Sequence, residues 1–176
     1  MGWSFKVHGG VAAGLGAVFL ALAWLTRLPG TLPLLDERWL LPLNFVVVFP
    51  TVTAALARLV LARTDKAQFW QASRCLPGKV QAGLAMLFLS GMAMIFLNMG
   101  REGNLQSAEV RDGKYFAFDT TARGTAELSW EQYQVALEVD QRSMLMIPGV
   151  VLVGAACAVL AAGELRRADH GVAPSR

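Results

Sequence analysis

Four long apolar blocks, separated by short charged segments, dominate the sequence and leave the chain few ways to fold. The blocks cover about residues 9–26, 39–57, 80–100 and 143–163, close to the roughly 20 residues that a helix needs to cross a bilayer. Backbone N–H and C=O groups find no water inside lipid, so each block should form a helix. The pattern predicts an all-α membrane protein with four transmembrane helices, built as one domain over residues 1–176.

The composition agrees with this prediction. Hydrophobic residues make up 55% of the chain and charged residues 16%, whereas soluble domains carry about 25% charged residues. The net charge of +3 does not indicate nucleic-acid binding, because the basic residues flank the apolar blocks and form no stripe with interleaved aromatics. We therefore expect the lipid bilayer as a partner and no nucleic acid.

The basic residues also predict an orientation. The two termini and the segment between the second and third blocks together carry nine basic and three acidic residues, against seven and ten on the other side. The side rich in Lys and Arg normally stays in the cytoplasm. We expect a multi-pass protein of the bacterial inner membrane with both termini in the cytoplasm. The polar segment 101–142 would then be a periplasmic insert between the third and fourth helices.

The first block has a second interpretation. Lys6, the apolar run and the sequence Ala21-Leu22-Ala23 are also typical of a cleaved signal peptide. The run continues through Trp24 to Thr26, which is long for a signal and favours a retained helix. Cleavage would leave three spans, and the sequence leaves both possibilities open.

Small residues suggest where the helices approach one another. Gly10 and Gly14 are four residues apart, as are Gly154 and Ala158, and such pairs allow close contact between helix backbones. The sequence thus predicts that these positions face neighbouring helices.

The insert contains signals for a β-hairpin. Residues 114–118 are rich in aromatics, which favour strands, and residues 125–128 could form the returning strand. Between them lies a turn over 119–124, in which Gly124 is suited to a positive φ. We expect the insert to fold back on itself here.

A helix should follow the hairpin. Ser129 is a good N-cap residue, and Gln132 stands where a capping box needs Glu or Gln. Trp130, Tyr133 and Leu137 would share one side of this helix. No helix breaker occurs before Pro148, so the helix should continue into the fourth span. The hairpin should then pack Tyr115 or Phe118 against that side, because an isolated hairpin is marginal in water.

The same segment resembles the insert of small bacterial four-helix integral membrane proteins. The resemblance rests on Asp112-Gly-Lys-Tyr115, a short strand, a turn containing glycine, Ser129-Trp-Glu-Gln-Tyr133 and Gln141-Arg142 before an apolar span. It implies a membrane fold with a Tyr-containing hairpin and helix before the last span, and it implies no particular activity.

The residues that carry common membrane chemistry are scarce. Neither Cys75 nor Cys157 lies in the external segments, so thiol exchange on that side is not expected. His8 and His170 lie near the cytoplasmic ends, away from where axial ligands of a haem would stand. The four blocks contain no Asp or Glu to relay protons. We predict no catalytic residues, no metal site and no cofactor, which favours a non-enzymatic protein and leaves an enzymatic role as an open alternative.

The function expected from these features is protein binding. The insert combines an ordered-looking hairpin and helix with aromatics that can serve as contact residues: Tyr115, Phe118, Trp130 and Tyr133. The expected partner is another membrane or periplasmic protein. One form of this idea is an immunity-type protein that protects against a membrane-active toxin, which rests on size and topology alone.

A third hypothesis comes from another class. A small-molecule carrier or a membrane enzyme subunit would need a polar cavity among the helices. The polar residues that could line one are Asn44, Thr51, Ser90 and Asn98. The hypothesis therefore predicts that these four side chains converge.

Overall fold

The computed structural model of the protein describes residues 2–28, 37–62, 66–99 and 105–171. Four helices are long and apolar enough to cross a membrane: α1 (Trp3–Leu25), α2 (Glu37–Leu61), α4 (Gly78–Met99) and α5 (Trp130–Gly171). Each corresponds to one of the expected apolar blocks. The prediction of four membrane-spanning helices is confirmed to that extent.

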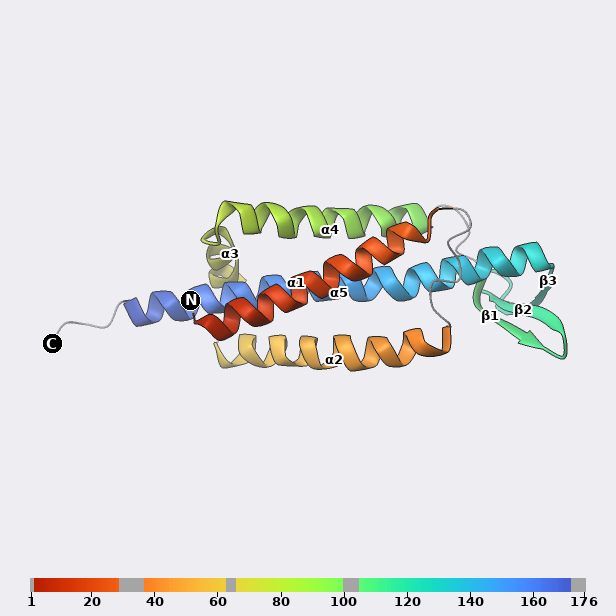
Figure 1. Cartoon of the computed structure of the whole chain (residues 1–176), viewed down its shortest axis with the longest axis horizontal. Helices are drawn as coiled ribbons and strands as arrows, with labels where there is room; N and C mark the ends of the chain where they lie inside the picture. Colours follow the sequence, from red (N-terminus) through yellow and green to blue (C-terminus); the bar gives the residue numbers. More distant parts are fainter. Residues whose placement is uncertain (1, 29–36, 63–65, 100–104, 172–176) are drawn as a thin grey trace.

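The helices are arranged around α5, which extends beyond the other helices at both ends (Figure 1). α1 crosses α5, while α2 and α4 run along opposite sides of it, and all three pack on it. Buried side chains from α1, α4 and α5, such as Leu20, Leu84 and Val153, form one core cluster. α5 is thus the element that positions the rest of the molecule.

Close packing of α1 on α5 depends on glycines other than those the sequence suggested. A Cβ atom on Gly16 would lie 3.0 Å from the carbonyl oxygen of Gly149 and 2.9 Å from a methyl group of Val153. Around Gly10 and Gly14, by contrast, no described atom lies within 4 Å of such a Cβ. The expected contact through Gly10 and Gly14 is wrong, because these residues are on the outer side of α1.

Exposed tryptophans mark both ends of the helical bundle. Trp3 and the Trp70 side chain of the short helix α3 (Lys66–Arg74) stand near one end, and Trp24 and Trp39 near the other. Amphipathic rings of this kind favour the two interfaces of a bilayer. The sequence did not predict α3. This helix follows α2 and precedes α4 in the chain, and it packs on α5.

The segment between α4 and α5 forms a three-stranded antiparallel sheet of β1 (Leu105–Arg111), β2 (Lys114–Asp119) and β3 (Gly124–Leu128). The expected hairpin corresponds to β2 and β3 and is confirmed. β1 is an additional strand, so the insert is larger than a hairpin. Ala108, Ala117 and Leu128 face α5 and bury a small core against Ala136.

Two turns join the strands. Asp112 and Gly113, both at positive φ (49° and 77°), form a two-residue connection between β1 and β2 of the kind that suits a hairpin's twist. In the second turn the left-handed residue is Arg123, at φ 52°, and not Gly124 as expected. The Asp119 carboxylate accepts the N–H of Thr121 at 2.7 Å and supports this turn from its start.

α5 runs without interruption for 42 residues from the insert through the bundle, as the sequence predicted. At 1.5 Å per residue the helix is about 63 Å long, twice the about 30 Å of a hydrocarbon core. Its first turns carry the sheet at the end of the bundle opposite the N-terminus of α1 (Figure 1). We call the three strands and residues 130–140 of α5 the insert module.

Candidate functional site

A reciprocal capping box fixes the start of α5. The Ser129 hydroxyl accepts the backbone N–H of Gln132 at 3.2 Å, and the Gln132 side chain accepts the N–H of Ser129 at 2.9 Å. Two N–H groups that the helix itself cannot satisfy are thereby paired. The predicted cap is confirmed, and it sets the direction in which Trp130 leaves the sheet.

An aromatic cluster follows directly from this cap. The Tyr115 ring of β2 lies 5.1 Å from the Trp130 ring and 4.8 Å from the Tyr133 ring, and Trp130 lies 5.9 Å from Tyr133. Pairs at such distances contribute about 0.5–1.5 kcal/mol beyond burial. Trp130 nevertheless remains 55% exposed. The expected packing of Tyr115 against this helix is confirmed, and it leaves an indole held firmly at the surface.

Phe118 does not belong to this cluster. Residues three apart on a strand point to opposite faces of a sheet, so Phe118 faces away from the side of Tyr115. It is 44% exposed and lines a separate hollow with Thr125, Asp140 and Met144. The four predicted contact residues therefore form no single surface: Tyr115, Trp130 and Tyr133 lie together, and Phe118 lies apart.

Arg142, to which the sequence assigned no structural role, ties three helices together. Its guanidinium donates to the Thr26 carbonyl at 3.2 Å and to the Asn98 side-chain oxygen at 3.1 Å. Thr26 ends α1 and Asn98 lies in the last turn of α4, where a cation is favoured by the helix dipole. Glu138, one turn earlier on α5, stands 3.9 Å from the same guanidinium. The buried arginine therefore joins the ends of α1 and α4 to α5, next to the insert module.

A second interhelical bond compensates for Pro148. Proline has no N–H, so the carbonyl of Met144, four residues earlier, loses its helical donor. The Asn44 side chain of α2 donates to that carbonyl at 2.9 Å. The other atom of the same amide, Asn44 Oδ1, is buried and has no hydrogen-bond partner among the described residues. The Asn44 amide therefore pairs the Met144 carbonyl, while its own side-chain oxygen remains without a described donor.

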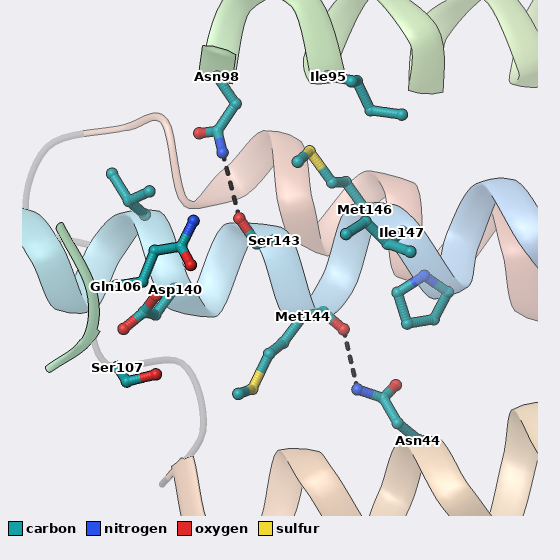
Figure 2. A pocket seen from close by; sticks show the side chains of 12 residues that line it. Asn44, Ile95, Asn98, Gln106, Ser107, Asp140, Ser143, Met144, Met146 and Ile147 are labelled. Carbon is teal, nitrogen blue, oxygen red and sulfur yellow. Dashed lines mark hydrogen bonds between the residues drawn. The ribbon is translucent and has the colours of Figure 1, made fainter. Parts of the chain in front are cut away.

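This unused acceptor borders a pocket at the junction of the bundle and the insert module (Figure 2). The pocket has a volume of about 780 Å³, within the range of small-molecule sites. Its described polar lining comes from α2, α4, β1 and α5: Asn44, Asn98, Gln106, Ser107, Asp140 and Ser143. Its apolar lining is Ile95, Val139, Met144, Met146, Ile147 and Pro148.

Only two of the four polar residues proposed for a cavity meet in this pocket. Asn44 and Asn98 line it. The Thr51 hydroxyl instead donates to the Val47 carbonyl of its own helix, and the Ser90 hydroxyl accepts the Trp24 indole N–H at 2.8 Å. The four side chains do not converge, so the carrier hypothesis loses the feature on which it was based.

Asp140 is the one ionisable side chain among the described residues that line the pocket. It lies before the apolar part of α5 and accepts the backbone N–H of Ala108 at 2.9 Å. That N–H belongs to an irregular stretch of β1, where Ser107 has a φ of 55°. Burial raises the pKa of the Asp140 carboxyl, although the N–H groups of Ala108 and Ser107 lower it. The carboxylate thus holds the bulge of β1 on α5 at an electrostatic cost.

Within the described ranges, no three His, Cys, Asp or Glu side chains gather in a way that could hold a metal ion. Both described cysteines are free thiols, with Cys75 exposed and Cys157 partly buried.

No family model, no curated protein and no solved structure matches the chain.

Proposed function

We propose that this chain is a non-enzymatic protein of the bacterial inner membrane whose insert module binds another protein on the periplasmic side. The observation that supports the proposal best is the exposed Trp130 ring, held against Tyr115 and Tyr133 at the start of a capped helix. Tryptophan and tyrosine are the residues most enriched among the energetic centres of protein interfaces.

The position of Trp130 argues against a role as a membrane anchor. Ser143, where the apolar part of α5 begins, lies thirteen positions further along the helix, which corresponds to about 20 Å. The other exposed tryptophans lie near the ends of the bundle, where an interfacial ring is expected. An indole this far from the bilayer gains nothing from lipid, so a protein surface is the better partner.

The aromatic surface has a defined extent. Val110 pairs with Tyr115 across β1 and β2 and is 54% exposed. Together Val110, Tyr115, Trp130 and Tyr133 form what we call the aromatic face. The other side of the sheet carries Phe118 together with an ion pair between Lys114 and Glu127 at 2.9 Å. The aromatic face is held rigidly before any partner arrives, which lowers the entropy cost of binding.

The proposed orientation follows from charge. The end of the bundle that holds the N-terminus of α1 carries most of the basic side chains outside the insert: Lys6, Arg58, Arg74, Lys79, Arg166 and Arg167. There the Phe5 ring lies 4.6 Å from the Arg58 guanidinium carbon and 5.5 Å from that of Arg166. The positive-inside tendency would place this end in the cytoplasm and the insert module in the periplasm.

Photo-crosslinking in cells tests the binding. A photoreactive amino acid at Trp130 should give a discrete protein adduct, and the same probe at Phe118, on the opposite face of the sheet, should give much less. A probe at Val18, exposed on α1, is the lipid-facing control. Lipid adducts alone from Trp130, or equal protein adducts from Trp130 and Phe118, would contradict the proposal.

Thiol labelling tests the orientation. In a Cys157→Ala background, a membrane-impermeant maleimide applied to intact spheroplasts should label Thr121→Cys in the β2–β3 turn and spare the exposed native Cys75. Labelling of Cys75 and protection of Thr121→Cys would show the opposite orientation and contradict the proposal.

A further inference from the structure

A strip along α5 is left uncovered by the other described helices. Ile147 is 54% exposed and Val151 41%, and around Gly154 no described atom lies within 4 Å of where a Cβ would stand. These residues and Ala158 recur every three or four positions, so they share one side of the helix. α1 packs on another side of α5, through Gly149 and Val153. On the two sides of the strip, α2 packs against Val159 and α4 against Val150, so the strip is the floor of a shallow apolar groove between them.

The pocket described above is one end of this groove. Ile147 lines it together with Asn44 of α2 and Ile95 of α4, so the two flanking helices border the strip here (Figure 2). At the other end the strip stops before Ala161 and Ala162, which are both 0% exposed. From Ile147 to Ala158 the floor is about 17 Å long. A membrane-spanning helix needs about 30 Å, whereas 17 Å suits a single acyl chain.

The polar end of the groove is rich in hydrogen-bond acceptors. Asn44 Oδ1 is buried without a partner among the described residues, and the Asp140 carboxylate stands in the same pocket. A buried acceptor left unpaired destabilises the protein, and a half-buried carboxylate attracts a cation. Each of these acceptors can take a hydrogen-bond donor, and the carboxylate favours a cationic one. The hydroxyl groups of Ser107 and Ser143 and the amide of Gln106 can donate to an anion beside it.

We propose that the pocket and groove bind one bilayer phospholipid whose head group carries a primary ammonium, such as phosphatidylethanolamine. The ammonium donates to Asp140, the phosphate accepts from the serine and glutamine side chains, and an acyl chain lies along Ile147, Val151 and Gly154. The site is distinct from the aromatic face and does not depend on the protein-binding proposal.

Lipid retention by the full-length protein tests this directly. The protein is reconstituted in equal mixtures of phosphatidylethanolamine and phosphatidylcholine with identical acyl chains, extracted gently, and analysed by native mass spectrometry. Phosphatidylcholine keeps the phosphate and tails but has no N–H to donate. We expect about a tenfold preference for the ethanolamine lipid, equivalent to about 1.4 kcal/mol. Equal retention of the two lipids would overturn the proposal.

Two variants separate the head group from the chain. Asp140→Asn should reduce the preference to about one while circular dichroism shows the fold retained, since asparagine keeps an acceptor for Ala108. Ile147→Trp should fill the groove and lower the retention of both lipids. Val18→Trp, at an exposed residue outside the groove, should behave like the native protein. Unchanged lipid retention in Ile147→Trp would contradict lipid binding in the groove. If Ile147→Trp lost an oligomer and kept its lipid, the groove would bind another protein chain, which would also contradict the proposal.

Discussion

The side-chain amide of Asn44 donates to the carbonyl of Met144 at 2.9 Å, at the one place in α5 where Pro148 removes the helical donor. In lipid no water can replace that donor. The bond therefore allows a proline within the central helix without leaving its backbone unsatisfied, and it fixes α2 against α5 beside the pocket.

This relationship predicts a coupling between Asn44 and Pro148. Asn44→Leu should destabilise the protein by about 1–2 kcal/mol, because it leaves a buried carbonyl unpaired. In a Pro148→Ala background the alanine N–H returns to Met144, so the same substitution should cost clearly less. Unfolding in mixed micelles by added denaturing detergent measures both. Strictly additive effects would show that the bond has no such role.

Arg142 should contribute more than an arginine at the surface. Arg142→Met removes the donors to Thr26 and Asn98 and should cost about 2 kcal/mol or more, since both acceptors are buried. The control is Arg167→Met: the Arg167 side chain is 70% exposed and stands 3.8 Å from Glu164, so its loss should cost little. Thermal unfolding in detergent compares them, and equal stabilities of the two variants would refute the role of Arg142.

The two kinds of glycine on α1 should respond oppositely to alanine. Gly16→Ala pushes a methyl group against the Gly149 carbonyl and Val153, and should destabilise the α1–α5 contact by about 1–3 kcal/mol. Gly14→Ala meets no described neighbour and should be neutral or slightly stabilising through helix propensity. The same unfolding assay applies. A destabilised Gly14→Ala would instead mean that this side of α1 is covered.

Docking of the insert module should weaken as pH rises. The raised pKa of Asp140 means that the folded state disfavours the charged carboxylate. The contribution of Asp140 to folding stability is therefore most favourable below its unfolded pKa of 3.8. That contribution is lost as pH rises through the higher pKa of the folded state. Nearby charges include Glu109 and Arg111, which pair with each other, and Arg142 and Glu138 on the same helix.

The contribution of Asp140 is isolated by a difference. The stability of the native protein minus that of Asp140→Asn, followed by amide exchange in β1, should fall as pH rises upward from the unfolded pKa of 3.8. A difference that stays flat or rises over this range would contradict the assignment.

The parts of the fold that sequence could predict are those governed by local rules. Apolar length identified the four spans, and the Ser129–Gln132 pair identified the start of α5. β1 was missed although Asp112-Gly113 is a strong hairpin signal, because its strand alternates weakly and lacks aromatics.

The parts that sequence could not predict depend on tertiary contacts. Arg142 resembles any charged residue at the edge of a span until α1 and α4 are seen to end beside it. In the same way, nothing in the local sequence distinguishes Gly16, which α5 covers, from Gly14, which it does not. Three of the four expected contact aromatics came together because they flank the capped helix start, whereas strand alternation separated Phe118.

The most direct test of the insert module as a rigid binding element is hydrogen–deuterium exchange of the whole chain in lipid nanodiscs. Amides of β2, paired on both sides, and of α5 from Tyr133 onward should exchange slowly. Ser129→Ala should speed exchange around Trp130 several-fold, for a cap worth about 1 kcal/mol. Exchange across residues 105–135 as fast as in an unstructured peptide would show that the module does not form, and the protein-binding proposal would fail with it.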